Sequence, residues 1–208
     1  MNSNTALLIV DVQYGFMPGG GLAVADGDAV VPVINRVASL FKNAVFTQDW
    51  HPANHVSFSS NHPGRQPFET ISLHYGEQIL WPTHCVQGTR DADLHDDLLV
   101  PQAQLIIRKG FHRDVDSYSA FMEADRKTST GLAAYLKARG ITSVYLCGLA
   151  TDYCVAWSAL DARSAGFEAA VIEDACRAID LNGSLQKAWH AMTEAGVGRI
   201  TSAQLLAS

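Results

Sequence analysis

The chain has 208 residues, 48% of them hydrophobic, and a formal net charge of −6. This length and apolar content allow a well-buried core, and no Pro/Gly/Ser-rich linker divides the chain, so we expect one domain over residues 1–208. The acidic balance and the lack of a basic block argue against a nucleic-acid-binding surface and a polybasic membrane-binding segment. The N-terminus is a poor signal peptide, and no apolar run approaches the ~18 residues that span a bilayer.

Short apolar runs alternate with longer amphipathic ones along the chain. The pattern predicts strands at residues 6–11, 44–49, 104–109, 143–148, 168–174 and 198–202. It predicts helices at residues 29–42, 130–140, 152–166 and 183–196. Apolar strands that alternate with helices indicate a parallel sheet with helices on both faces and right-handed crossovers. The predicted fold is therefore a three-layer α/β/α domain with a six-stranded parallel sheet.

Residues 50–100 contain much Pro, Gly, His and Asn, and at most a short helix near Leu94–Leu99. Loops of this length inside a compact domain are uncommon and usually functional. We therefore expect the segment to provide metal-binding and substrate-binding residues.

The four cysteines are scattered, without a C-x-x-C pair and without the density of a secreted disulfide framework. This usage favours reduced thiols and a cytoplasmic protein. We expect Cys147, inside a strand, and Cys176 to be structural.

Four reactive side chains lie at the ends of predicted strands. Asp11, Asp49 and Lys109 close the first three strands, and Cys154 comes just after the fourth. Ligands of an open parallel sheet bind beyond the carboxyl ends of its strands, so we expect these residues to share one site. Each has an ordinary structural explanation when taken singly, such as a turn or a buried thiol. Together they favour a catalytic site.

Cys154 is the expected nucleophile of that site. It lies at the start of the 152–166 helix, where free N–H groups lower the pKa of a thiol and can bind an oxyanion. A lysine favours the thiolate further, and a carboxylate can accept the thiol proton. A cysteine, an aspartate and a lysine are therefore sufficient for acyl transfer.

A second group of residues has the composition of a metal site. Asp49 and His51 lie on the same side of an extended segment, His84 follows in the same long loop, and His55 is a further candidate. One carboxylate with two or three imidazoles suits Zn²⁺, Fe²⁺ or Mn²⁺ with open coordination positions.

These residues lie in motifs that resemble a known family. "DVQ", "DWHPANHVSF", "WPTHCVQGT", "RKG", "DSYSAF" and "GLATDYCV" occur in the order found in the nicotinamidase/pyrazinamidase branch of the isochorismatase-like cysteine hydrolases. The likeness extends from residue 6 to about residue 182. It implies an isochorismatase-like fold with the sheet order 3-2-1-4-5-6.

The resemblance also implies roles for single residues. The general base, catalytic lysine and nucleophile match Asp11, Lys109 and Cys154. The metal ligands match Asp49, His51 and His84, while His55 matches a histidine that binds the metal in some members only.

The remaining implied roles concern the substrate. A non-proline cis peptide bond between Leu149 and Ala150 would turn the Ala150 N–H toward that of Cys154, forming an oxyanion hole. The residues expected to contact the substrate are Phe16, Trp81, Tyr118, Leu149 and Ala150. The first motif departs from the family pattern, because Gly15 stands where an acidic residue more often precedes the phenylalanine.

The implied activity is hydrolysis of nicotinamide to nicotinate and ammonia through a cysteine thioester, with a role in NAD salvage. One divalent ion, zinc before iron or manganese, would bind the pyridine nitrogen, and pyrazinamide would be a second substrate. Three alternatives are an amidohydrolase of the same superfamily for carbamoyl or ureido substrates, a redox-sensing thiol protein and a pure metal-binding module. The first two would leave the metal ligands without a use, and the third would leave Asp11, Lys109 and Cys154 without a role. Exposed apolar helix faces leave a homo-oligomer open.

Overall fold

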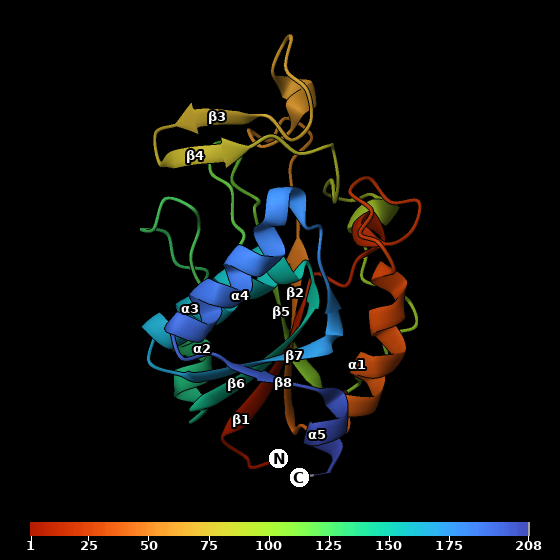
Figure 1. Ribbon diagram of the computed structural model, residues 1–208, viewed down its shortest axis with the longest axis vertical. Helices are drawn as coiled ribbons and strands as arrows, with labels where there is room; N and C mark the ends of the chain where they lie inside the picture. Colours follow the sequence, from red (N-terminus) through yellow and green to blue (C-terminus); the bar gives the residue numbers. More distant parts are fainter. Residues whose placement is uncertain (208) are drawn as a thin grey trace.

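A six-stranded parallel sheet forms the centre of the computed structural model, which describes residues 1–207 (Figure 1). Ser208, the last residue of the expected domain, lies outside the described residues. The strand order is β5-β2-β1-β6-β7-β8, and every neighbouring pair is parallel. Numbered along the chain, these strands have the predicted order 3-2-1-4-5-6, which is confirmed. Their bounds are Thr5–Val10 (β1), Asn43–Asp49 (β2), Ala103–Lys109 (β5), Ser143–Leu149 (β6), Glu168–Arg177 (β7) and Gly198–Ile200 (β8).

Helices cover both faces of this sheet. Helices α1 and α5 pack on one face against β7, and α3 and α4 pack together on the other, with α2 beside them (Figure 1). The helices are Val30–Ala38 (α1), Leu132–Ala138 (α2), Ala156–Ser164 (α3), Ser184–Glu194 (α4) and Ser202–Leu206 (α5). The first four lie within the predicted ranges, whereas α5 was not predicted. No helix formed by residues 1–207 is long and apolar enough to cross a membrane.

The long segment between β2 and β5 is more structured than the sequence predicts. It contains an antiparallel hairpin of β3 (Thr70–Leu73) and β4 (Gly76–Ile79), which projects from the sheet (Figure 1). The short helix that the sequence allowed near Leu94–Leu99 does not form, and a single 3₁₀ turn at Arg90–Ala92 precedes that stretch. The reason is that Leu94 forms an isolated bridge with Gln13, which keeps the backbone extended there.

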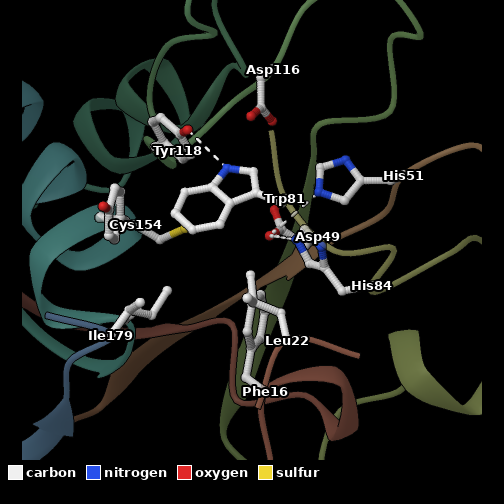
Figure 2. A pocket seen from close by; sticks show the side chains of 12 residues that line it. Phe16, Leu22, Asp49, His51, Trp81, His84, Asp116, Tyr118, Cys154 and Ile179 are labelled. Carbon is white, nitrogen blue, oxygen red and sulfur yellow. Dashed lines mark hydrogen bonds and ion pairs between the residues drawn. The ribbon is translucent and has the colours of Figure 1, made fainter. Parts of the chain in front are cut away.

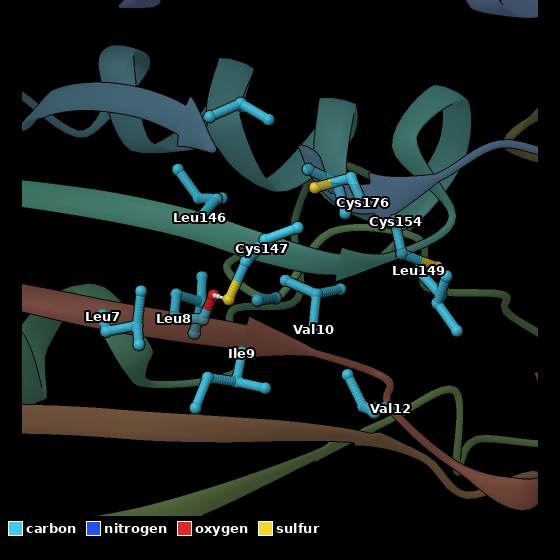
Figure 3. Packing of buried hydrophobic residues seen from close by; sticks show 14 of the residues in the cluster. Leu7, Leu8, Ile9, Val10, Val12, Leu146, Cys147, Leu149, Cys154 and Cys176 are labelled. Atoms are coloured by element: carbon cyan, nitrogen blue, oxygen red, sulfur yellow. Dashed lines mark hydrogen bonds between the residues drawn. The ribbon is translucent and has the colours of Figure 1, made fainter. Parts of the chain in front are cut away.

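The core explains the apolar strands. Every residue of β1 is buried, and its side chains pack against β6 (Figure 3). In β6, Gly148 has φ +114°, and a Cβ there would lie 2.0 Å from the Val10 carbonyl oxygen, so only glycine permits this approach to β1. Cys147 and Cys176 are buried in the core, as expected, and all four cysteines are free. Because the strand order reverses between β1 and β6, the carboxyl ends of these strands open a crevice.

Candidate active site

Lys109, Asp11 and Cys154 meet at the carboxyl ends of the central strands. Lys109 ends β5 and is fully buried, and its Nζ lies 2.8 Å from Asp11 Oδ2 and 3.2 Å from Cys154 Sγ. The same ammonium group donates to a carboxylate oxygen of Asp49 at the end of β2. Cys154 lies in a five-residue π-helical turn, Thr151–Val155, that leads into α3. The structure thus brings together all four residues expected at the strand ends.

Asp11 is held by the strand next to it. Its backbone takes the left-handed conformation, φ 48°, which aspartate tolerates better than most residues. Its N–H donates to Thr47 Oγ1 in β2 (3.1 Å), and the Thr47 hydroxyl donates back to Asp11 Oδ1 (2.6 Å). One carboxylate oxygen therefore faces Thr47, while the other faces Lys109.

The charges of this trio follow from its burial. Burial raises the pKa of Asp11 to about 6, although Lys109 opposes the shift. Burial alone would lower the pKa of Lys109, but the adjacent carboxylates raise it well above the ordinary value, so the lysine stays charged. Burial also raises the pKa of the Cys154 thiol, against the effect of Lys109. The lowered thiol pKa expected from the helix start is therefore wrong, because desolvation outweighs it. Cys154 needs a base to become a thiolate.

Asp49, His51 and His84 form a cluster suited to a metal ion. Their potential ligand atoms lie within 4.8 Å of one another, and Asp49 Oδ2 is 3.6 Å from His51 Nε2 and 3.9 Å from His84 Nε2. The Nδ1 atoms of the two imidazoles are 2.8 Å from the Gly110 carbonyl oxygen and 2.7 Å from that of Pro82. Carbonyl partners fix the proton on Nδ1 and leave the Nε2 lone pairs free for a metal.

The electrostatics of the cluster also fit a cation. Lys109 and His51 lower the pKa of Asp49 despite its burial, so its carboxylate is charged. Burial and the neighbouring His51 lower the pKa of His84 to about 4, which keeps this imidazole neutral. Gly110, at φ +64°, leaves space for His51, because a Cβ there would lie 2.4 Å from the ring. Burial would lower the pKa of His51, but the adjacent Asp49 raises it, so a bound metal ion would displace a proton from this imidazole. One carboxylate with two imidazoles is a donor set that suits Zn²⁺ and similar ions.

His55 lies outside this cluster. Its ring packs against that of His51, with centroids 4.3 Å apart. Its Nδ1 lies 2.7 Å from Ser57 Oγ, and its Nε2 lies 3.3 Å from the Val115 carbonyl oxygen. His55 instead groups with His51 and Asp116.

A cavity lies between Cys154 and the histidine cluster and is lined by residues of both (Figure 2). The Trp81 ring lies between Cys154 and the metal cluster in the close view, and its Nε1 donates to the Tyr118 hydroxyl (3.0 Å). The lining residues are Phe16, Leu22, Asp49, His51, Trp81, His84, Asp116, Tyr118, Ala150, Tyr153, Cys154 and Ile179.

Four of the five expected substrate contacts line this cavity, and one does not. Leu149 is fully buried in the core cluster, and its side chain is outside the lining (Figure 3). The bond between Leu149 and Ala150 is cis, as the resemblance implied. The Ala150 carbonyl accepts the N–H groups of Tyr153 and Val155, both at 3.1 Å, and so begins the turn that holds Cys154.

Several residues of the site were missed. Gln13 is fully buried, and its side chain bonds the N–H and the carbonyl of Asp49, both at 2.8 Å. Gln78 of β4 donates to Asp116 Oδ2 (2.8 Å) and approaches the Tyr118 hydroxyl (3.2 Å). Gln13 and Asp116 belong to the quoted motifs "DVQ" and "DSYSAF", and that membership was the only signal for them.

Comparisons with known proteins add to this geometry. Residues 5–204 match the model of the Isochorismatase domain family. A nicotinamidase of Acinetobacter baylyi is 64% identical over 204 residues, which cover 98% of this chain and 95% of that protein. The structure of an Acinetobacter baumanii nicotinamidase/pyrazinamidase is 64% identical, with a TM-score of 0.97 over 98% of this chain and 99% of that one. A pyrazinamidase of Pyrococcus horikoshii in complex with zinc is 35% identical, with a TM-score of 0.78 over 95% and 99% of the two chains.

Proposed function

The chain belongs to the isochorismatase family, and within it to the nicotinamidases, and on this premise we propose that it hydrolyses nicotinamide to nicotinate and ammonia through a thioester on Cys154. The observation that most supports this route is the position of Lys109 Nζ, within 3.2 Å of both Asp11 Oδ2 and Cys154 Sγ. A base, a cation and a thiol are thus in mutual reach, and the thiol lines the cavity.

In the first half-reaction, Asp11 takes the proton of the Cys154 thiol, and Lys109 stabilises the thiolate. The sulfur attacks the amide carbon, and the negative charge on oxygen is held by the N–H groups of Ala150 and Cys154. One such donor is typically worth ~3 kcal/mol. Asp11 then returns its proton to the departing amine, so that the C–N bond breaks and ammonia leaves.

In the second half-reaction, Asp11 acts as a base again. It takes a proton from water, whose oxygen attacks the thioester carbon. The C–S bond breaks, nicotinate leaves, and the proton returns to the sulfur of Cys154. The burial that raises the pKa of Asp11 to about 6 suits a group that accepts and releases a proton near neutrality.

The Asp49, His51 and His84 side chains would hold one divalent ion. Zinc is our first choice, because the ligand set suits it and the Pyrococcus relative was solved with zinc, and iron and manganese come next. Such an ion, when bound, offers an open coordination position to a pyridine nitrogen. Phe16, Trp81 and Tyr118 supply the aromatic walls for the ring.

We extend the proposal to pyrazinamide, which has the same carboxamide on a ring with one more nitrogen. Hydrolysis of nicotinamide would place the protein in NAD salvage. The cytoplasmic location and the homo-oligomer remain predictions from the sequence.

The decisive experiment is ammonia release from nicotinamide by the purified protein, with and without chelator, beside Cys154→Ala. We expect activity that requires both the metal and Cys154, while the variant still folds and binds metal. Cys176→Ala is the matched control, because it removes a buried thiol that does not line the cavity. Turnover by Cys154→Ala would disprove the nucleophile. No activity in reduced, metal-loaded protein would disprove the substrate and direct the search to ureido and carbamoyl amides.

A further inference from the structure

Gly15 has no space for a side chain. A Cβ at this position would lie 2.6 Å from Cys85 Sγ and 2.8 Å from Asp91 Oδ2. Atoms that close would force a rearrangement, so a side chain does not fit at position 15 while Asp91 stays in place. The carboxylate of Asp91, which comes from the 3₁₀ turn Arg90–Ala92, occupies that space instead.

Asp91 joins two segments that are distant in sequence. Its Oδ2 accepts the N–H of Cys85 (2.6 Å), and its Oδ1 accepts the N–H of Gly21 (3.1 Å). Hydrogen bonds to a charged carboxylate are about twice as strong as neutral ones. A single side chain therefore fixes the backbone of both segments.

Both segments provide parts of the cavity. Cys85 directly follows the metal-ligand candidate His84, and Gly21 directly precedes Leu22. Leu22 and Phe16 form the side of the cavity next to His84 in the close view, which we call the cavity floor (Figure 2). The rings of Phe16 and His84 are in contact, with centroids 5.5 Å apart.

The packing between the segments is tight. A Cβ on Gly21 would lie 2.3 Å from the Thr83 carbonyl oxygen, and the Leu22 N–H donates to the Gly15 carbonyl (2.9 Å). A shift of the Gly21 backbone would therefore reach both the loop before His84 and the floor.

We propose that Asp91 is a positioning residue that holds the metal ligand His84 and the cavity floor in one arrangement. The proposal rests on the proposed function, since it assigns His84 to the metal and the floor to the substrate ring. Asp91 has no bond to the side chains of Asp11, Lys109 or Cys154 among the described hydrogen bonds and ion pairs. Its loss should therefore weaken binding more than chemistry.

The first test compares Asp91→Asn with Asp93→Asn. The asparagine keeps the shape but puts an N–H₂ group against one backbone N–H. Asp93 is the matched control, because within residues 1–207 its half-exposed carboxylate pairs only with Arg90. In Asp91→Asn we expect the KM for nicotinamide to rise and Zn²⁺ affinity, titrated into chelator-treated protein, to fall, each roughly 10-fold, with kcat near wild type.

The second test exchanges the two positions. Gly15→Asp alone should lower the melting temperature and Zn²⁺ affinity, because two side chains then compete for one space. Gly15→Asp combined with Asp91→Ala should recover part of both losses, a coupling that a double-mutant cycle measures.

The outcomes separate this proposal from the proposed function. If Asp91→Asn behaves like Asp93→Asn in KM and Zn²⁺ affinity, or if kcat falls as much as KM rises, the positioning role is wrong. If the double variant has a lower melting temperature and a lower Zn²⁺ affinity than both single variants, the two positions do not share one space in the way proposed. A wild-type protein that binds Zn²⁺ but releases no ammonia would disprove the function, while the Zn²⁺ titrations would still test Asp91.

Discussion

Asp11, Lys109 and Cys154 meet at the carboxyl ends of the central strands, where Cys154 lines the cavity. His51, His84 and Trp81 line the other side of the cavity and come from the long segment between β2 and β5. The strand-end residues are aligned by the register of the parallel sheet, in which Asp49 pairs with Lys109. The loop residues depend on individual contacts.

Those contacts differ for each loop residue. His51 relies on the Gly110 carbonyl, His84 on that of Pro82, and Trp81 on the Tyr118 hydroxyl. The comparison teaches that the groups for bond breaking are fixed together by the fold, while the groups for recognition are fixed separately. A substitution on the strand side should damage stability and chemistry at once, and one on the loop side should mainly change binding.

The largest expected effect is that of Lys109→Met. It leaves the buried carboxylates of Asp11 and Asp49 without their shared cation, and removing one partner of a buried ion pair typically costs 3–5 kcal/mol. Urea unfolding should show a loss of about this size, together with loss of turnover. Lys187→Met, on the exposed side of α4, is the control. Equal stability of the two variants would refute the strand-side half of the comparison.

Gln13→Ala tests the point where the two sides meet. Gln13 bonds the N–H and carbonyl of Asp49, so its loss should cost about 2 kcal/mol in unfolding free energy and also weaken Zn²⁺ binding. Gln102→Ala, which removes a bond to the Ala38 carbonyl at the end of α1, should lower stability only. Unchanged Zn²⁺ affinity in Gln13→Ala would show that Asp49 does not depend on this support.

The pH profile should reveal Asp11. Its pKa is raised to about 6, and the base must be ionised, so kcat/KM should fall as pH drops through about 6, approaching 10-fold per pH unit. The contribution of Asp11 to the free energy of unfolding should change in the opposite direction. It should rise as the pH falls from about 6 toward 4, because protonation removes the cost of burying the charged carboxylate. Measuring the metal content at each pH distinguishes this fall in kcat/KM from a fall caused by loss of the metal. A limb centred near 4 would contradict the assignment.

The smallest expected effect is that of Tyr118→Phe. It removes the acceptor of Trp81 Nε1, and an unsatisfied donor of this kind costs about 1 kcal/mol, so the KM for nicotinamide should rise about 5-fold with kcat nearly constant. Tyr135→Phe in α2, outside the cavity lining, is the control. A fall in kcat of the same size would mean that this side of the cavity also affects chemistry.

The strand side was largely predictable from the sequence. Apolar runs locate the strands, and the carboxyl ends of parallel strands meet at one edge, so the sequence alone groups Asp11, Asp49, Lys109 and Cys154. The direction of the Cys154 pKa shift could not, because it depends on how many atoms from distant segments exclude water.

On the loop side, the metal ligands could be predicted from the sequence, but the contacts that hold them in place could not. His51 and His84 belong to motifs, whereas Asp91 acts through the backbone N–H groups of Cys85 and of Gly21, which is 70 positions away in sequence. The β3–β4 hairpin was missed because Thr70–Leu73 and Gly76–Ile79 are short, and their side chains are mostly exposed or only half-buried.

The position of β1 has a consequence for how the protein reaches its native state. It pairs with β2 on one side and with β6 on the other, where Thr5 stands opposite Ser143. Contacts between such distant segments form late, because the intervening chain must lose its freedom first, whereas helices form within microseconds. Asp11, Lys109 and Cys154 come together only after both pairings exist. After dilution from denaturant, ammonia release should therefore return later than the helical circular dichroism signal, so that the activity itself reports completed assembly.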